Sequence, residues 1–219
     1  MRDVTILAMS NKLTRRYHRD DVQIIKREEA YQGFFRMEKL HLKQRRFDGQ
    51  WSETFTREIF VRGDAVGVLL YDPRSDQLLM VEQFRPGALY DETQSPWMFE
   101  IVAGMTEEGE TLEDVVRREA QEEAGCDIEA LEKLFSYWVS PGGMDEQIAL
   151  FLGVIDSRKV TEGVYGLDDE HEDIRVELVD FSEAVRGLQD GRINNAMAII
   201  ALQWLQLNRE RLQQQWCQS

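Results

Sequence analysis

The 219-residue sequence predicts an α/β (α+β) protein in which a mixed sheet has helices on both faces and is preceded by a small antiparallel β domain. Three observations lead to this fold class. Alternating strand patterns occupy residues 20–62. From residue 65 onward, short continuous apolar strands surround one helix at 112–124. Two late helices can then cover the second face of the sheet.

The N-terminal β domain is assigned to residues 1–56. Strand patterns are present at 22–25, 34–42 and 51–61, and Asp48-Gly49 between the last two is a hairpin signal. The apolar stretch at residues 5–9 is too short for a signal-peptide core. We assign the remaining residues, 57–219, to the main domain.

In the main domain, buried strands alternate with helices and turns. A turn is predicted at 72–76 and an acidic loop at 163–173. Helices are predicted at 182–189 and 195–216, and residues 196–207 of the second helix are apolar nearly all round. The strands are predicted at residues 65–71, 77–83, 97–103, 131–139, 147–155 and 175–180.

Charge and cysteine usage narrow the class of protein. A net charge of -15 argues against non-specific nucleic-acid or anionic-membrane binding, because no basic excess can displace phosphate counterions. No apolar run approaches the roughly 20 residues that span a bilayer. Cys126 and Cys217 form neither a disulfide framework nor a metal-ligand spacing. We therefore expect a soluble cytoplasmic protein.

The helix at 112–124 has clear ends. Thr111 is the expected N-cap, with Asp114 three residues on in a capping-box-like position. Gly125 is the expected left-handed C-cap.

The apolar stripe of this helix turns acidic half-way. Helical spacing continues from Val115 and Val116 onto Glu119 and Glu123. Burying carboxylates together is unfavourable unless a cation neutralises them or they take up protons. Oxygen ligands of this kind suit Mg²⁺ or Mn²⁺. The competing interpretation is a solvated acidic face on a helix that leans away from the core at its end.

The residues around this helix carry a family resemblance. Residues 104–126 closely resemble the Nudix box, whose fixed positions are Gly104, Glu110, Arg118, Glu119, Glu122, Glu123 and Gly125. Farther on, Pro141 resembles the marker of the ADP-ribose pyrophosphatase subgroup of that family. Residues 57–60, 81–85 and 169–174 are also similar to bacterial members of the subgroup.

The resemblance implies a fold, a reaction and an assembly. The fold would be a Nudix α/β/α sandwich, and the N-terminal domain would be exchanged across a homodimer. The reaction would be hydrolysis of ADP-ribose to AMP and ribose 5-phosphate, with other ADP-sugars as further substrates. It would use Mg²⁺, with Mn²⁺ as the alternative.

The resemblance also assigns roles at the metal site. The metal ligands would be the Ala103 carbonyl, Glu119, Glu123 and Glu172, with Glu122 as a further ligand, while Glu110 and Arg118 shape the site. Glu170 would be the general base, although the division of roles between Glu170 and Glu172 stays open. We interpret His171 between them as a spectator. Without the box, such an acidic run would usually be a solvated loop.

Substrate contacts are expected from both domains. Arg57, Arg62 and Arg85 are candidates for phosphate and ribose, and Phe34 and Phe35 for stacking on adenine. By resemblance, Phe34, Phe35, Arg57 and Glu58 would reach the active site of the partner subunit. The remaining matching positions are Met105, Ser140, Pro141, Gly142 and Glu146. The alternative is that the two Phe are core residues and the Arg side chains form surface ion pairs.

Two other functions remain. An enzyme of the same kind could hydrolyse another nucleotide sugar, such as a GDP-sugar, because the base pocket is not readable from the sequence. A protein of a different class would be a catalytically silent sensor of ADP-ribose-like ligands. Such a sensor should have eroded box carboxylates, whereas every acid of the box is present here.

Overall fold

The computed structural model describes residues 13–217, so the apolar stretch at 5–9 lies outside the described residues. The chain divides into two compact units. Unit 1 contains the described residues up to Arg62 together with Gly142–Met144, and unit 2 contains Gly63–Pro141 and the chain from Asp145 onward.

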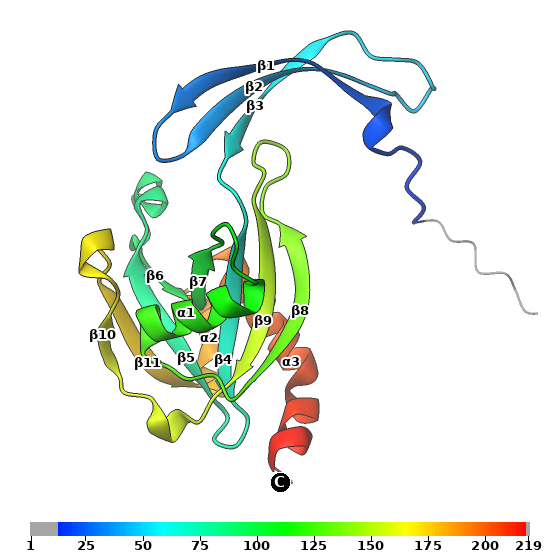
Figure 1. Cartoon of the computed structure of the whole chain (residues 1–219). Helices are drawn as coiled ribbons and strands as arrows, with labels where there is room; N and C mark the ends of the chain where they lie inside the picture. Colours follow the sequence, from blue (N-terminus) through cyan, green and yellow to red (C-terminus); the bar gives the residue numbers. More distant parts are fainter. Residues whose placement is uncertain (1–12, 218–219) are drawn as a thin grey trace, which may run out of the picture. The chain divides into compact units, whose positions relative to one another are not determined.

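Over its described residues, unit 1 is a three-stranded antiparallel sheet in the order β1-β2-β3 (Figure 1). A short 3₁₀ turn, η1 (Arg19–Asp21), precedes the strands. The strands are β1 (Val22–Gln32), β2 (Arg36–Gln44) and β3 (Phe55–Val61). The predicted antiparallel β domain is therefore confirmed, with Gly49 at φ 84° in the expected turn between β2 and β3.

The strand limits in unit 1 differ from the prediction. β1 runs well beyond residue 25, because its charged second half still pairs with β2, as in Glu29 opposite Glu38. Phe34 lies in the turn between β1 and β2 rather than in a strand. β3 pairs with β2 as far as Val61 opposite Arg36, so the compact unit ends after Arg62, later than the expected boundary at residue 56.

The described strands of unit 2 form an eight-stranded sheet in the order β10-β11-β5-β4-β9-β8, with β6 beside β5 and β7 beside β4 (Figure 1). β4 and β9 are parallel, while the neighbouring pairs are antiparallel, so the sheet is mixed. The strands are β4 (Ala65–Asp72), β5 (Gln77–Phe84), β6 (Trp97–Glu100), β7 (Val102–Met105), β8 (Ala130–Trp138), β9 (Gln147–Val154), β10 (Gly163–Tyr165) and β11 (Ile174–Asp180).

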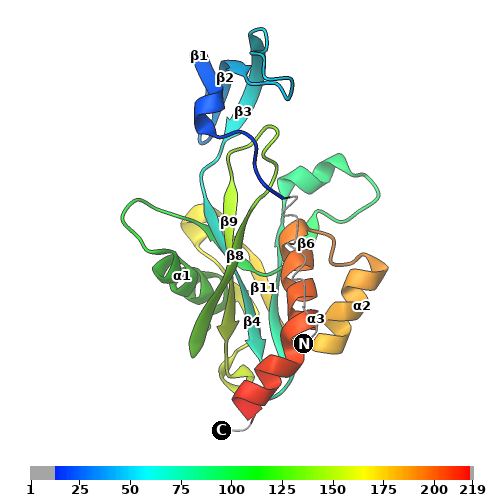
Figure 2. The same ribbon diagram turned by 90° about the vertical axis from the view of Figure 1, so that its right-hand side faces the viewer.

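Helices cover both faces of this sheet. Figure 2 shows α1 (Leu112–Ala124) on one face and α2 (Phe181–Asp190) and α3 (Ala196–Cys217) on the other. β4 is buried along its whole length, because successive side chains enter the two cores in turn. Val68 and Leu70 pack toward α1, whereas Leu69 and Tyr71 pack toward α3. The predicted α/β/α sandwich is confirmed.

The late apolar helix is a core helix. At its start, Asn195 Oδ1 accepts a bond from Ala198 N at 3.0 Å, and Asn195 Nδ2 donates to Phe99 O at 2.6 Å. Farther along, Arg209 donates twice to Asp76, at 2.7 and 2.6 Å. These contacts attach the start of α3 to β6 and its second half to the turn between β4 and β5. None of the helices within residues 13–217 combines the length and apolar character that crossing a bilayer requires.

Candidate active site

The ends of α1 have the predicted caps. Thr111 Oγ1 accepts a bond from Asp114 N at 3.2 Å. At the other end, Gly125 has φ 54°, and the N–H groups of Gly125 and Cys126 donate to Gln121 O and Ala120 O, both at 2.9 Å. The Gly125 bond is the 5→1 bond of an αL cap, and the two bonds together satisfy carbonyls of the last turn.

The buried face of α1 does end in carboxylate. Val115, Val116 and Ala120 are fully buried, and Glu123 is only 3% exposed beside them. The alternative of a solvated acidic face is therefore wrong for Glu123. A carboxylate at this depth needs hydrogen bonds, a counter-ion or a proton.

The residues facing Glu119 and Glu123 come from a strand crossing that the sequence did not predict. Residues 97–103 were expected to form one strand, but the chain breaks at Ile101 and passes from β6, on β5, to β7, on β4. The crossing is possible because β4 pairs with β5 only from Leu70 onward, which leaves room between the two strands before that point. β7 thereby lies against α1.

Ala103 and Gly104 on β7 meet the two carboxylates. Ala103 N donates to Glu123 Oε2 at 3.1 Å. Because the N–H and C=O of one strand residue project from the same edge, the Ala103 carbonyl lies on this side as well. A Cβ atom built at Gly104 would stand 1.8 Å from Glu119 Oε1. Glu119 therefore occupies the space that any side chain at position 104 would fill.

Arg118 joins the other acids of the box. Its guanidinium donates to Glu119 at 2.8 Å, to Glu122 at 2.9 Å and to Glu110 at 3.2 and 3.3 Å. One cation thus fixes three carboxylates in a partly buried cluster, which agrees with its expected role of shaping the site.

The acidic loop docks on the C-terminal end of α1. Gly166 N donates to Glu122 O at 3.2 Å, and the Tyr165 ring is so close to Gly125 that a Cβ there would lie 2.6 Å from it. Glu172 is half-buried and accepts a bond from Leu167 N at 3.2 Å. Glu172 is thereby brought to the carboxylates of the helix, although it is far from them in sequence.

The two remaining candidates in this loop are exposed. Glu170 ends the 3₁₀ turn η4 (Asp168–Glu170), and His171 follows it with φ 57°. Glu172 is thus half-buried, whereas Glu170 is exposed.

The electrostatics of the site favour proton uptake in the absence of a cation. Burial raises the pKa of Glu123 to about 8, and the nearby charges of Glu119 and Glu172 act in the same direction. Burial likewise raises the pKa of Glu119 to about 7, although Arg118 opposes the shift. Both carboxyls have pKa values well above that of an ordinary glutamate because they share a poorly solvated site.

The donor set suits a hard divalent cation. Mg²⁺ and Mn²⁺ bind carboxylate and carbonyl oxygens, and Gly104 leaves room for the Glu119 carboxylate among them. Within the described residues, however, no three or more His, Cys, Asp or Glu side chains are arranged as a ready metal group. The hydrogen bonds of the three acids keep their carboxylates apart. Glu119, Glu123 and Glu172 are each turned to a separate donor, namely Arg118, Ala103 N and Leu167 N.

Sequence reasoning missed Glu100. This residue ends β6, is 7% exposed, and accepts bonds from Arg85 Nε at 2.9 Å and Gln83 Nε2 at 3.2 Å. The sequence signal that could have found this residue is an acidic side chain inside the otherwise apolar run 97–103. Arg85 itself, a predicted substrate residue, is close enough to Glu123 to favour its charged form and thus lower its pKa.

The other predicted residues of unit 2 have mixed positions. Met105 ends β7 opposite Ala65, and Glu146 is buried before β9. Ser140 and Pro141 are exposed in the loop between β8 and β9.

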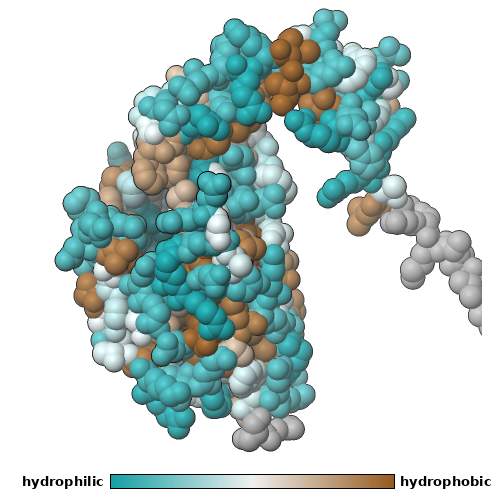
Figure 3. Space-filling model, in the orientation of Figure 1, coloured by the Kyte–Doolittle hydropathy of each residue, from teal (hydrophilic) through white to brown (hydrophobic). Residues whose placement is uncertain are grey.

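The surface of the molecule around α1 is mostly hydrophilic, as Figure 3 shows.

The predicted residues of unit 1 form their own group. Phe34 is 89% exposed, and its ring centroid lies 4.8 Å from that of Phe35. The Arg62 guanidinium lies 5.5 Å from the centroid of the Phe35 ring. Arg57 and Glu58 are exposed on β3, and Gly142 is exposed in the segment that belongs to unit 1. Neither Phe34 nor Phe35 is fully buried.

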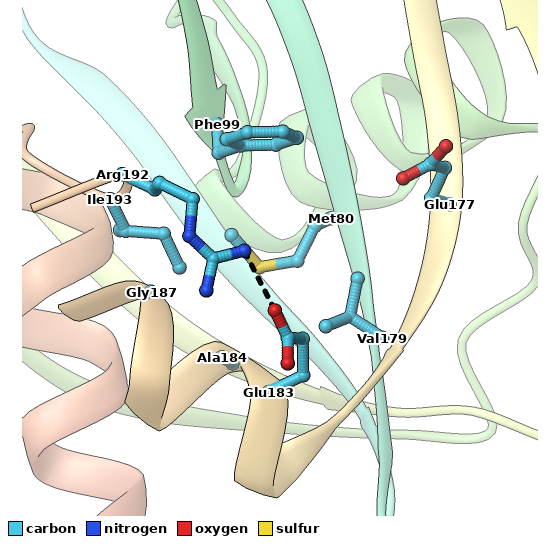
Figure 4. A pocket seen from close by; sticks show the side chains of 9 residues that line it. All are labelled: Met80, Phe99, Glu177, Val179, Glu183, Ala184, Gly187, Arg192 and Ile193. Carbon is cyan, nitrogen blue, oxygen red and sulfur yellow. Dashed lines mark hydrogen bonds and ion pairs between the residues drawn. The ribbon is translucent and has the colours of Figure 1, made fainter. Parts of the chain in front are cut away.

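A cavity of about 140 Å³ lies elsewhere, under α2 (Figure 4). Its floor is apolar, with Met80, Phe99 and Ile193, and the Glu183–Arg192 ion pair at 2.7 Å stands at its edge. Met80 and Ile193 belong to the core on the α2–α3 side of the sheet, whereas the acidic cluster lies on the α1 side. This cavity is therefore separate from the candidate active site.

The NUDIX domain matches residues 61–201, and the chain belongs to this family. Curated relatives agree with the resemblance stated above. The chain is 44% identical over 200 residues to an ADP-ribose pyrophosphatase of Escherichia coli (strain K12), covering 91% of this chain and 95% of the relative. It is 42% identical over 205 residues to an ADP-ribose pyrophosphatase of Haemophilus influenzae, covering 93% and 94%.

Two further comparisons are more distant. A GDP-mannose pyrophosphatase of Cronobacter sakazakii is 32% identical over 187 residues, covering 85% of this chain and 96% of the relative. A crystal structure of an ADP compounds hydrolase superposes with a TM-score of 0.63 at 19% identity, covering 85% of this chain and 95% of the other. At that identity the structural likeness confirms the fold.

Proposed function

We propose that this protein hydrolyses the diphosphate of ADP-ribose to AMP and ribose 5-phosphate, and that of other ADP-sugars to AMP and the corresponding sugar phosphate. The observation that carries the proposal is the Glu119–Glu123 pair, buried on α1 against Ala103 and Gly104. The ADP-ribose pyrophosphatases among the relatives support the choice of substrate.

The proposed reaction depends on a divalent cation, Mg²⁺ or alternatively Mn²⁺. The Ala103 carbonyl, Glu119, Glu123 and Glu172 would hold it, with Glu122 as a further ligand. When bound, such a cation neutralises diphosphate oxygens and lowers the pKa of water. Gly104 keeps space for the Glu119 carboxylate, and Arg118 orients Glu119 and Glu122 from the side.

We assign Glu170 as the general base and Glu172 as the ligand. Glu172 faces the helix carboxylates, whereas exposed Glu170 is available to take a proton from water. A Glu170→Gln variant should lower kcat by about 100-fold and leave the Mg²⁺ concentration needed for half-maximal activity unchanged. A Glu172→Gln variant should instead raise the Mg²⁺ concentration needed for half-maximal activity. The reverse pattern would exchange the two roles.

We also propose a homodimer in which Phe34, Phe35, Arg57 and Glu58 serve the partner's active site, with the N-terminal domain of residues 1–56 exchanged. The high exposure of Phe34 supports this proposal, because an aromatic side chain without a packed environment is a common interface residue. Arg62, Arg85, Met105, Ser140, Pro141, Gly142 and Glu146 would complete the substrate contacts.

A mixing experiment tests the exchange. Arg57→Ala and Glu123→Gln proteins, each nearly inactive alone, are unfolded together and refolded. If Arg57 serves the partner, the mixed dimer contains one intact site and activity returns. If Arg57 serves its own chain, every site stays defective and no activity returns.

A GDP-sugar is the second candidate substrate, because GDP-mannose pyrophosphatases are also among the relatives. Turnover of ADP-ribose, ADP-glucose and GDP-mannose by the Mg²⁺-loaded protein decides between them. Release of AMP from ADP-ribose with the highest kcat/KM supports the first choice. A preference for GDP-mannose would replace it, and absence of turnover on all three would favour the silent sensor.

We place the enzyme in the cytoplasm. Its two cysteines, buried Cys126 and exposed Cys217, are both unpaired, which suits a reducing compartment. We assign it no nucleic-acid or membrane partner. Cell fractionation with an antibody against the protein tests the location.

A further inference from the structure

We propose that Glu100 is a positioning residue that fixes the Arg85 guanidinium beside the carboxylates of α1, where it receives the anionic diphosphate of the substrate. This inference rests on the proposed function of the site. It adds a residue that lies outside the box and does not itself touch the substrate.

The first support is the convergence of donors on one oxygen. Glu100 Oε2 accepts hydrogen bonds from Arg85 Nε at 2.9 Å and from Gln83 Nε2 at 3.2 Å, and it forms an ion pair with Arg85 Nη2 at 2.8 Å. Glu100 is only 7% exposed. Charge-assisted bonds made away from water are the stronger ones, so this contact holds the guanidinium in one orientation.

The second support is the rigid frame behind the pair. Glu100 on β6 stands opposite Val81 on β5, and Arg85 directly follows β5. The backbone N–H of Arg85 donates to Pro96 O at 2.8 Å. Donor and acceptor are thus both mounted on the paired strands, and only the side chain of Arg85 needs to be oriented.

The third support is the direction in which Arg85 is held. Glu100 binds the edge of the guanidinium that carries Nε and Nη2, and the Arg85 side chain remains 40% exposed. Glu100, which holds Arg85, lies three residues before Ala103, whose N–H donates to Glu123 at 3.1 Å. The positive charge of Arg85 lowers the pKa of Glu123, in agreement with this neighbourhood. A cation that is anchored on one edge and open to solvent on the other is suited to a phosphate group.

Loss of Glu100 should have two consequences. Arg85 would regain rotamer freedom, so binding substrate would have to order it again. Glu123 would also become a competing partner for Arg85, since within residues 13–217 Glu100 is the acid that holds its guanidinium. Both effects weaken substrate binding more than they slow the chemical step.

The test is the affinity of the metal-free protein for ADP-ribose, measured by calorimetry in EDTA so that turnover does not interfere. Glu100→Gln keeps the shape and removes the charge, and we expect Kd to rise about tenfold. In the Mg²⁺-loaded enzyme, KM should rise by a similar factor while kcat changes less than about threefold. Glu100→Asp should recover part of the affinity.

Coupling to Arg85 separates positioning from a general structural role. Arg85→Lys should lose as much affinity as Glu100→Gln, and the double variant should lose no more than either alone. Glu129→Gln is the matched control, because Glu129 holds Arg74 at 2.9 Å at the other end of β4 and should leave affinity unchanged. Arg85→Lys retains Glu100, so the coupling can be judged even if Glu100→Gln proves unstable.

Two results would overturn the inference: unchanged affinity in Glu100→Gln, or additive losses in the double variant. A wild-type protein that neither binds nor hydrolyses ADP-ribose would instead refute the proposed function. The two failures are therefore distinguishable.

Discussion

Glu119 Oε1 lies within 1.8 Å of the point where Gly104 would carry a Cβ atom. Gly104 is not among the glycines with positive φ, so its backbone could accommodate other residues. The glycine that opens the box is therefore required for space: a helix carboxylate is pressed against the bare strand backbone. This contact ties the strand β7 and the helix α1 into one site.

The first prediction follows from this contact. Gly104→Ala should lower kcat/KM by at least about 100-fold, because the methyl group displaces the Glu119 carboxylate. Gly163→Ala is the control, since it is also a strand glycine but its Cβ would meet only Tyr165, at an ordinary 3.8 Å. Steady-state kinetics with ADP-ribose and Mg²⁺, with circular dichroism to verify folding, make the comparison. Equal activity of the two variants would contradict the steric role.

The second prediction concerns stability against pH without metal. The pKa of Glu123 is raised to about 8, above its unfolded value of 4.5, so the folded state retains a proton that the unfolded state releases. The free energy of unfolding should therefore fall as pH rises from about 5 to about 8. Glu123→Gln removes this loss, and at pH 8 in EDTA it should be more stable than wild type by about 4 kcal/mol.

Thermal unfolding of both proteins between pH 5 and pH 9 tests this difference. Comparing the variant with wild type cancels the effect of the overall charge, which is nearly the same in both. A gap that does not widen with pH would show that Glu123 is not the titrating group.

The third prediction concerns Arg118, which holds three glutamates together. Arg118→Met should lower activity about 100-fold, because the carboxylates lose their shared cation and orientation. It should also lower the Tm of the metal-free protein at pH 8, and added Mg²⁺ should recover part of the loss. The neighbouring Arg117 donates to Ile128 O at 2.9 Å instead, so Arg117→Met should change activity less than about threefold.

The fourth prediction compares two helix caps. Gly125 ends α1 at φ 54° and Gly191 ends α2 at φ 81°, but only Gly125 has a ring against it. Gly191→Ala should cost about 1 kcal/mol for the left-handed backbone alone. Gly125→Ala should cost roughly 2–3 kcal/mol and reduce activity as well, because Tyr165 must move and the acidic loop follows it. Urea unfolding and kinetics measure the two effects.

Much of the fold was readable from the sequence because its signals are local. The apolar runs of β4 and β9 and the caps Thr111 and Gly125 depend on neighbouring residues, and the structure confirms them. The acid-ended stripe of α1 was readable for the same reason, since helical spacing alone places Glu123 with Val116.

The features that escaped prediction depend on contacts between distant segments. The break at Ile101 follows from the separation of β4 and β5, which residues 97–103 do not encode themselves. The role of Glu100 depends on Arg85 arriving from another strand. The charged second half of β1 has no apolar alternation, so its pairing with β2 was invisible to pattern analysis.

Unit 1 is not one continuous stretch of chain. Phe60 N donates to Gly143 O at 2.8 Å, and Gly142–Met144 come from the connection between β8 and β9. A single cut after residue 56 or residue 62 would therefore divide a folded unit rather than release one. Transplanting this unit onto another protein would therefore require moving two separate pieces of the chain. A fusion that carried only the N-terminal segment would lack residues 142–144, which belong to the same unit.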